Sequence, residues 1–156
     1  MEQITAADDR LVTTFGRLVE AHAAVGRRTG RSLERHCRIP TAWFEVLLRI
    51  ARADGGQVSM GGLAQQVALT SGGITRLLDR MVEAGLVQRV PCPTDRRVQF
   101  AALTDQGRSK LDEALLVHSA DLREVFAGFS AQDLDDLDRL LDHLRGSTDP
   151  RSTSST

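Results

Sequence analysis

The apolar positions between residues 63 and 107 follow two periodicities in turn, first helical and then alternating. Residues 63–67 form a short helical segment, and Thr70 then offers a hydroxyl suited to capping a second helix over residues 70–84. The apolar residues of this second helix recur every three or four positions, at Ile74, Leu77, Leu78 and Met81. Gly85 ends the helix, because a residue without Cβ readily adopts the left-handed backbone of a helix C-terminus. The pattern predicts two short helices joined by a turn.

Beyond Gly85 the alternation predicts a ribbon of two strands. Side chains two residues apart lie on the same face of a strand. Val87, Arg89 and Pro91 share one face of the first strand, and Val98, Phe100 and Ala102 share one face of the second. The strands flank a polar tip at residues 92–97, and Leu103-Thr104 opens another helix. Val58-Ser59, after a turn at residues 54–56, is expected to supply a short third strand. Together these elements predict a winged helix-turn-helix.

Two helices are expected before this unit. Residues 5–36 should form one long helix, whose apolar stripe has the four-and-three spacing of helix-to-helix packing at Leu11, Phe15, Leu18, His22 and Val25. We interpret His22 as a histidine packed at a subunit contact, with no ligand or metal role. Pro40 begins the next helix. This helix is apolar on two faces and is therefore expected to be buried, with Trp43, Val46, Leu47 and Ile50 on one face and Phe44, Leu48 and Ala51 on the other.

Two more helices are expected after Thr104. The first carries a stripe that mirrors the N-terminal one, at Leu111, Leu115, His118, Leu122 and Val125. Ser130 with Asp133 is a capping signal for the last helix, where Leu134, Leu137, Leu140, Leu141 and Leu144 are periodic. Residues after Arg145 have nothing to bury and are expected to be disordered. Because a winged-helix unit of this size cannot cover such stripes, we expect the terminal helices to intertwine with a second copy.

The predicted fold class is therefore mainly α with a small β-wing, a winged helix-turn-helix flanked by N- and C-terminal dimerisation helices. The expected organisation has four parts: 1–38 for the N-terminal helix, 39–107 for the winged helix-turn-helix, 108–145 for the C-terminal helices and 146–156 for the tail. At 156 residues, 41% of them hydrophobic, the chain is long enough for one globular domain.

The net charge of −1 conceals an uneven distribution. Residues 63–108 hold six arginines against four acidic residues, a balance of +2, whereas residues 109–145 hold four basic and nine acidic residues, a balance of −5. One surface can therefore approach a polyanion while the other is repelled by it. Lys110 is the only lysine. Contacts with phosphate would accordingly use planar arginine side chains, which donate two hydrogen bonds at once.

The sequence also bears on location. It contains no run of about 18 apolar residues. The N-terminal residues Met1–Thr5 have neither the basic start nor the apolar stretch of a secretion signal. We therefore expect a cytoplasmic protein with no membrane partner. Cys37 and Cys92 are too few for a disulfide framework, and a reducing compartment would keep both as thiols.

The order of residues in this region is more specific than the architecture. The matching pieces are Leu63-Ala64, Ile74 to Met81, Gly85-Leu86-Val87, Arg89, Asp95-Arg96-Arg97, Leu103-Thr104 and Gly107. In sequence and spacing they strongly resemble the MarR family of transcription regulators, and the likeness extends more weakly over the flanking helices. The resemblance implies a homodimer that binds a palindromic double-stranded DNA site and often releases it when a small ligand or an oxidant arrives.

The candidate DNA contacts of the second helix are Ser71, Gly72, Gly73, Thr75, Arg76 and Arg80. Hydroxyl and arginine side chains near a helix start can reach base edges in the major groove. The family pattern usually has small hydroxyl residues where Gly72-Gly73 stands here. This departure favours close approach of backbone N–H groups to a phosphate, where the helix dipole helps.

In the wing, Asp95-Arg96-Arg97 resembles the family motif in which the aspartate braces the second arginine. By this resemblance Arg97 enters the minor groove, whose negative potential favours arginine. Asp95 fixes its direction without contacting DNA itself. The alternative is an ion pair that only stiffens the hairpin.

Ligand control is predicted only through the resemblance. In MarR-like proteins the effector cavity lies between the dimerising and DNA-binding regions. A phenolic or aromatic carboxylate would there have Arg27 or Arg31 as anion partner and Trp43 or Phe44 as a stacking wall. The arginine-rich segment from Arg27 to Arg38 is also explained by a solvated helix face, and packing alone explains both aromatic residues.

The sequence also bears on three other function classes. An enzyme is disfavoured, because the chain has no glycine-rich phosphate loop, His-Glu-x-x-His, CxxC or nucleophile elbow; no cofactor or metal is expected either. A cysteine-based redox regulator is the second class: the basic neighbours of Cys37 could lower its pKa, and oxidation of an exposed Cys92 at the wing could disturb DNA contact. The third is a winged-helix module for protein contacts alone, which the wing arginines argue against.

Overall fold

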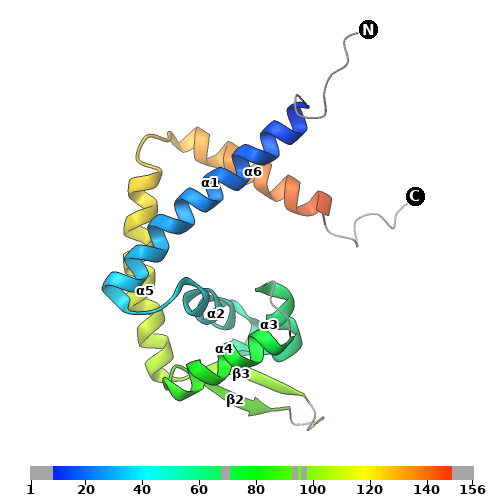
Figure 1. Ribbon diagram of the computed structural model, residues 1–156, viewed down its shortest axis with the longest axis vertical. Helices are drawn as coiled ribbons and strands as arrows, with labels where there is room; N and C mark the ends of the chain where they lie inside the picture. The colour runs from blue at the N-terminus through cyan, green and yellow to red at the C-terminus, as the bar shows by residue number, and fades with distance from the viewer. Residues whose placement is uncertain (1–8, 68–70, 93–94, 96–97, 149–156) are drawn as a thin grey trace, which may run out of the picture. The chain divides into compact units, whose positions relative to one another are not determined.

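The computed structural model describes residues 9–67, 71–92, 95 and 98–148 (Figure 1). The elements are α1 (Arg10–Ser32), a π-helical turn η2 (Leu33–Cys37), α2 (Thr41–Arg52), a 3-10 turn η3 (Asp54–Gly56), β1 (Gln57–Ser59), α3 (Met60–Gln66), α4 (Ser71–Glu83), β2 (Val87–Pro91), β3 (Gln99–Leu103), α5 (Asp105–Val125) and α6 (Ala131–Thr148). The predicted mainly helical fold with a small β-wing is confirmed. The chain divides into two compact units, Met1–Leu122 and Arg123–Thr156.

The wing sheet is antiparallel, with strand order β1-β3-β2. Ala101 of the central strand pairs with Val58 on one side and Arg89 on the other, so the predicted third strand is confirmed. The alternation expected for the returning strand is wrong in part. The strand begins at Gln99 rather than at Val98, and Ala101, Ala102 and Leu103 are all buried. The reason is that α2 and α3 both pack against β3.

The helix-turn-helix begins earlier than its apolar pattern suggests. The Ser59 hydroxyl accepts a hydrogen bond from the Gly62 N–H at 3.1 Å, and this cap starts α3 at Met60, three residues before the predicted Leu63. Thr70, the cap expected for the second helix, lies outside the described residues. The cap satisfies an N–H group that α3 itself leaves without a partner.

The end of α4 is as predicted. Gly85 has a φ of 73°, and the Leu86 N–H donates to the Met81 carbonyl at 3.0 Å, which is the closing bond of a glycine-terminated helix. Thr104 ties the next helix to this turn. Its hydroxyl donates to the Gly85 carbonyl at 2.6 Å and accepts from the Gly107 N–H at 2.9 Å. Thr104 therefore caps α5, whereas Leu103 is the last residue of β3.

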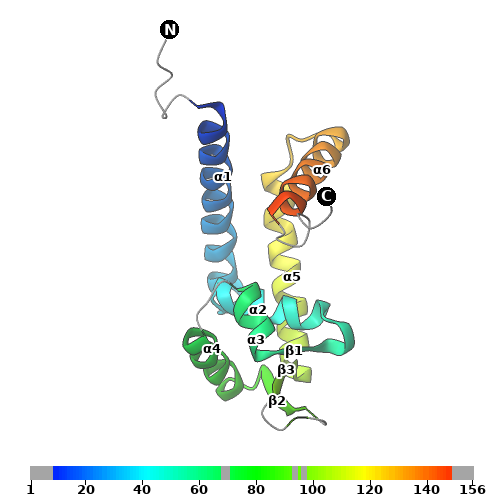
Figure 2. The same ribbon diagram turned by 90° about the vertical axis from the view of Figure 1, so that its right-hand side faces the viewer.

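Close packing holds the start of α5 in place. A Cβ atom on Gly107 would overlap the carbonyl oxygen of Leu86. Only glycine fits where α5 meets the turn between α4 and β2. Figures 1 and 2 show α2, α3, α4 and the sheet gathered at the C-terminal end of α1 and the N-terminal end of α5.

Helix α2 lies in the core, as its two apolar faces predict. Phe44, Val46, Leu47 and Ile50 are at most 3% exposed. Pro40 is the N-cap and the helix begins at Thr41, one residue later than expected. Ala51 is exposed, so the prediction that the whole second face is buried is wrong. Trp43 and Leu48 are half-buried against the core.

Helix α1 begins at Arg10, where the Asp9 carboxylate accepts from the Leu11 N–H at 2.8 Å; the start expected at residue 5 lies outside the described residues. The helix ends at Ser32 and continues as η2 to Cys37. The predicted apolar stripe is largely uncovered in the single chain. Leu11 is 76% exposed and Phe15 66% exposed.

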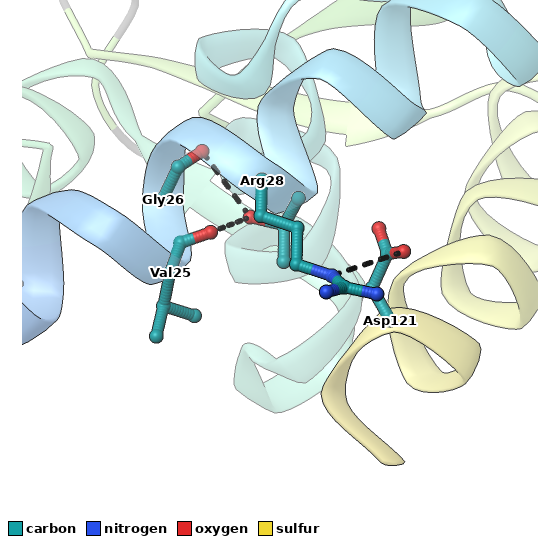
Figure 3. Close-up of polar contacts among 5 residues, drawn as sticks. Val25, Gly26, Arg28 and Asp121 are labelled. Atoms are coloured by element: carbon teal, nitrogen blue, oxygen red, sulfur yellow. Dashed lines mark hydrogen bonds and ion pairs between the residues drawn. The ribbon is translucent and has the colours of Figure 1, made fainter. Parts of the chain in front are cut away.

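Polar contacts fasten α1 and η2 to α5. The Arg28 guanidinium reaches from α1 to the Asp121 carboxylate, 3.9 Å away (Figure 3). Lys110 donates from α5 to the carbonyl of Cys37, at the end of η2, over 3.3 Å. A positive charge at this position stabilises the helix end, which carries a partial negative charge.

The second unit contains α6 and the predicted capping box. The Ser130 hydroxyl accepts from the Asp133 N–H at 3.2 Å and donates to the Asp133 carboxylate at 2.6 Å. The donation from the Ser130 hydroxyl, together with that from the Ser130 N–H at 2.9 Å, lowers the pKa of the Asp133 carboxyl. The helix continues through Thr148, so the disorder predicted from residue 146 is wrong for three residues. Within this last turn, the Ser147 hydroxyl donates to the His143 carbonyl at 2.9 Å.

Candidate nucleic-acid interface

Helix α4 has one buried face and one exposed polar face. Ile74, Leu78 and Met81 are at most 2% exposed. The opposite face carries Gly72, Thr75, Arg76, Asp79 and Arg80, all exposed, with Gly73 half-buried. Most of the predicted contacts of the second helix therefore share one accessible face. Ser71 is the first residue of α4 in the described backbone.

An ion pair joins α4 to the wing, and the sequence pattern does not predict it. The Arg89 guanidinium of β2 lies 2.5 Å from the Asp79 carboxylate, and both side chains are partly exposed. An isolated pair of this kind contributes at most about 1 kcal/mol to stability. Its geometric effect matters more, since it fixes β2 against the exposed face of α4. Opposite charges ten residues apart gave no sequence signal, because only the turn at Gly85 brings them together.

Arg80 has a contact of its own inside the chain. Its guanidinium carbon lies 5.9 Å from the centroid of the Trp43 ring, which is within the range of a cation–π interaction. Trp43 was expected in an effector pocket and Arg80 at DNA. The structure brings these two residues of α2 and α4 into contact. A change in the position of either side chain therefore affects the other.

The wing tip is described only in part. The carbonyl of Asp95 accepts from the Val98 N–H at 3.0 Å, which tightens the hairpin. Arg96 and Arg97 lie outside the described residues, so their roles stay predictions. The Cys92 N–H donates to the Val98 carbonyl at 3.0 Å and closes the ribbon.

The four predicted effector residues do not share one environment. Arg27 and Arg31 are exposed on α1, whereas Phe44 is 3% exposed. The Phe44 ring packs on the His118 imidazole, with centroids 4.8 Å apart. Burial lowers the pKa of His118, and the nearby Asp121 carboxylate opposes this shift. Phe44 thus has a packing role, which was the simpler explanation of this aromatic residue.

The structure disfavours the alternative in which basic neighbours lower the pKa of Cys37, and it supports the unreactive thiol that the sequence already favoured. The residue is 2% exposed, while Arg35, His36 and Arg38 point to solvent around it. Burial raises the pKa of the Cys37 thiol, the Glu113 carboxylate raises it further, and Lys110 only partly offsets both. A buried thiol with a raised pKa forms little thiolate and reacts slowly. Cys92 is half-buried rather than fully exposed as expected.

The described residues contain no group of three or more His, Cys, Asp or Glu side chains placed to hold a metal ion. No helix in that part of the chain is both long and apolar enough to cross a membrane.

Comparisons with known proteins agree with this geometry. Residues 39–98 match the model of the MarR family. The uncharacterized HTH-type transcriptional regulator YkoM of Bacillus subtilis is 26% identical over 133 residues, which cover 85% of this chain and 84% of that protein. The MarR family regulator Sco3205 of Streptomyces coelicolor, solved in complex with DNA, superimposes with a TM-score of 0.80 at 23% identity, covering 100% of this chain and 97% of that one.

A second solved structure extends the comparison. A mutant MarR from E. coli, complexed with operator DNA, superimposes with a TM-score of 0.69 at 26% identity and covers 85% of this chain and 94% of that one. The match to Sco3205, at lower identity, bears on the fold alone. Members of the family are transcription regulators and not enzymes, in agreement with the motif analysis. Residues 39–98, which hold the winged helix-turn-helix, therefore match the MarR family of transcription regulators, and proteins similar to the chain over most of its length are transcription regulators of this kind.

Proposed function

We propose that the protein is a homodimeric repressor, which binds a palindromic DNA duplex through α4 and the wing and releases it when a small aromatic anion binds. The single observation that carries the DNA-binding part is the exposed polar face of α4, with Thr75, Arg76 and Arg80, above a fully buried apolar face. A helix of this kind fits the major groove, where each base pair offers a distinct set of donors and acceptors. The mutant MarR from E. coli that was solved with operator DNA, at 26% identity, supports this part.

Each contact then has a role. Arg76 and Arg80 read base edges, and Thr75 adds a hydroxyl contact. The backbone at Ser71, Gly72 and Gly73 approaches a phosphate at the helix N-terminus. In the wing, Arg97 enters the minor groove beside Arg96, and Asp95 fixes its direction.

Uncovered apolar side chains support the homodimer. Leu11 and Phe15 on α1 are 76% and 66% exposed, and Leu140 on α6 is 55% exposed. Surface of this kind on long helices is stabilised when a second chain covers it. Two copies related by a twofold axis would place two α4 helices in successive major grooves, which requires a palindromic site.

The proposed effector is a phenolic compound or an aromatic carboxylate. Arg27 and Arg31 are accessible on α1 as anion partners, and Trp43 offers a half-buried aromatic face. The cation–π contact between Trp43 and Arg80 supplies a route by which a ligand at Trp43 would disturb a DNA-contacting side chain. The redox alternative is disfavoured for Cys37, because its thiol is buried and its pKa is raised.

Selection from a random duplex pool at physiological salt tests the proposal. We expect enrichment of a palindrome whose half-sites lie about one helical turn apart. A folded, dimeric protein that enriches no sequence would contradict the proposal and favour a module for protein contacts. Once a site is known, release by phenolic and aromatic anions and by peroxide separates the ligand-controlled regulator from the redox-controlled one.

A further inference from the structure

The outer face of α2 and the end of α3 enclose a cavity of about 310 Å³ that is partly open to solvent. Its lining residues are Glu45, Leu48, Arg49, Arg52, Ala53 and Gln66. Those of α2 recur every three or four positions and so share one face of that helix. The volume lies at the lower end of the range for small-molecule sites, about 300–1,000 Å³. None of the four predicted effector residues lines this cavity.

The cavity is rich in unpaired positive charge. It has two guanidinium groups, of Arg49 and Arg52, and one carboxylate, of Glu45. Within the described part of the chain, neither arginine forms a salt bridge, not even with Glu45 on the same face of α2. Arginine in a partly enclosed site usually has a carboxylate or phosphate partner. In this cavity the place of that anionic partner is open to a ligand.

One nitrogen atom of the cavity lining, in the Arg49 side chain, lacks a hydrogen-bond acceptor in the described part of the chain. The Nε atom of Arg49 is buried and has no hydrogen-bond partner among the residues that the structure describes. A buried N–H group without an acceptor is unfavourable, and an oxygen atom placed in the cavity would remove this cost. The planar guanidinium donates two parallel hydrogen bonds to a carboxylate, so one anion can satisfy Nε and a terminal nitrogen together.

The remaining lining residues narrow the class of ligand. Leu48 and Ala53 offer apolar surface, and the Gln66 side chain offers an amide that both donates and accepts. We propose that this cavity binds a small organic carboxylate, with its carboxylate on Arg49 and Arg52 and its hydrocarbon part on Leu48 and Ala53. The Glu45 carboxylate disfavours a polyanion such as DNA, since it would face further negative charge.

The test is calorimetric titration of the full chain, free of DNA, with butyrate, which lacks the aromatic ring of the proposed effector. We expect butyrate to bind saturably, one per chain, while the corresponding neutral amide, butyramide, does not bind. Arg49→Gln keeps a polar side chain but removes the guanidinium, so it should weaken binding by about tenfold or more. Arg52→Gln is the second variant and should weaken binding if the first fails to fold. Circular dichroism melting checks the fold of each.

A matched control locates the site. Arg17→Gln removes the same group from an exposed position on α1, outside both the cavity and the proposed effector region, and should leave butyrate binding unchanged. No binding of butyrate, or equal binding by wild type and the folded Arg49→Gln and Arg52→Gln variants, would overturn the proposal. It would also be overturned if Arg49→Gln weakened DNA binding and left carboxylate binding intact, since the arginines would then contact phosphate. Because ligand binding is measured without DNA, failure of the DNA-binding proposal does not affect the result.

Discussion

Helices α4 and α1 are both amphipathic, yet they expose opposite faces. In α4 the apolar residues Ile74, Leu78 and Met81 are at most 2% exposed, and the polar face points to solvent. In α1 the apolar residues Leu11 and Phe15 are 76% and 66% exposed. A helix whose apolar face is covered by its own chain is held in place without a partner and can present its polar face to another molecule. A helix with an uncovered apolar face is expected to gain its stability from a second chain.

The largest effect is expected where the chain covers α4 itself. Leu78→Ala should lower the free energy of unfolding by about 2–5 kcal/mol, since it removes a fully buried side chain and leaves a cavity. The control is Val82→Ala on the same helix, where the side chain is 38% exposed and the cost should be much smaller. Urea denaturation measures both. Equal losses would contradict the view that α4 is held by its buried face.

The uncovered face of α1 should control dimerisation. Phe15→Ala should weaken the dimer by about 2 kcal/mol, the typical cost of removing an aromatic anchor from an interface. Sedimentation equilibrium measures the dissociation constant. Arg17→Ala, an exposed polar site on the same helix, is the control. If the wild type is monomeric, or if Phe15→Ala leaves the dimer unchanged, the comparison between the two helices fails.

The exposed face of α4 should control DNA binding without affecting the fold. Arg76→Ala should cost about 1–3 kcal/mol in affinity for the selected duplex and relax the preference at one base pair. Arg139→Ala, on α6 and paired with Asp136, should bind as wild type. Fluorescence anisotropy over a range of salt concentrations measures both. A uniform loss over all sequences would instead assign Arg76 to a phosphate contact.

The smallest effect is expected on α5, where His118 packs on Phe44 of the winged-helix core. Burial lowers the pKa of His118, so the folded chain holds a neutral imidazole at a pH where the unfolded chain takes up a proton. Stability should therefore fall as the pH drops below the ordinary histidine value of 6.5, and the contribution is retained above that value. His118→Gln should flatten this part of the profile of unfolding free energy against pH. If the profile of His118→Gln is the same as that of the wild type, this pH dependence does not come from His118.

Local patterns predicted most of the fold. The end of α4 at Gly85, the cap at Ser130 and the third strand at Val58-Ser59 all depend on neighbouring residues, and the structure confirms each. The predictions are wrong where a more distant element, or a cap that was not predicted, determines which residues are buried or where a helix begins. The strand pattern at Ala101 and Ala102 changed because α2 and α3 both cover β3, and α3 began early because Ser59 caps it.

The candidate DNA-binding face was also predicted only in part, because local patterns do not reveal contacts between different elements. Thr75, Arg76 and Arg80 share an exposed face of α4, as helical spacing implies. The ion pair between Asp79 and Arg89 and the cation–π contact between Arg80 and Trp43 were not predicted. Each joins residues on different elements, and only the packing of those elements brings the partners together.

The sequence by itself determined the order of elements, their caps and the polar face of α4, because these depend on periodicity and on hydrogen bonds between residues close in the chain. The tertiary structure alone decided that the thiol of Cys37 is buried, that Phe44 packs on His118 and that Gln66 of α3 joins Arg49 and Arg52 in lining a cavity, where neither arginine forms a salt bridge with a described residue. Burial and electrostatic environment are properties of residues that are distant in sequence and close in space, and they are fixed only when the helices pack.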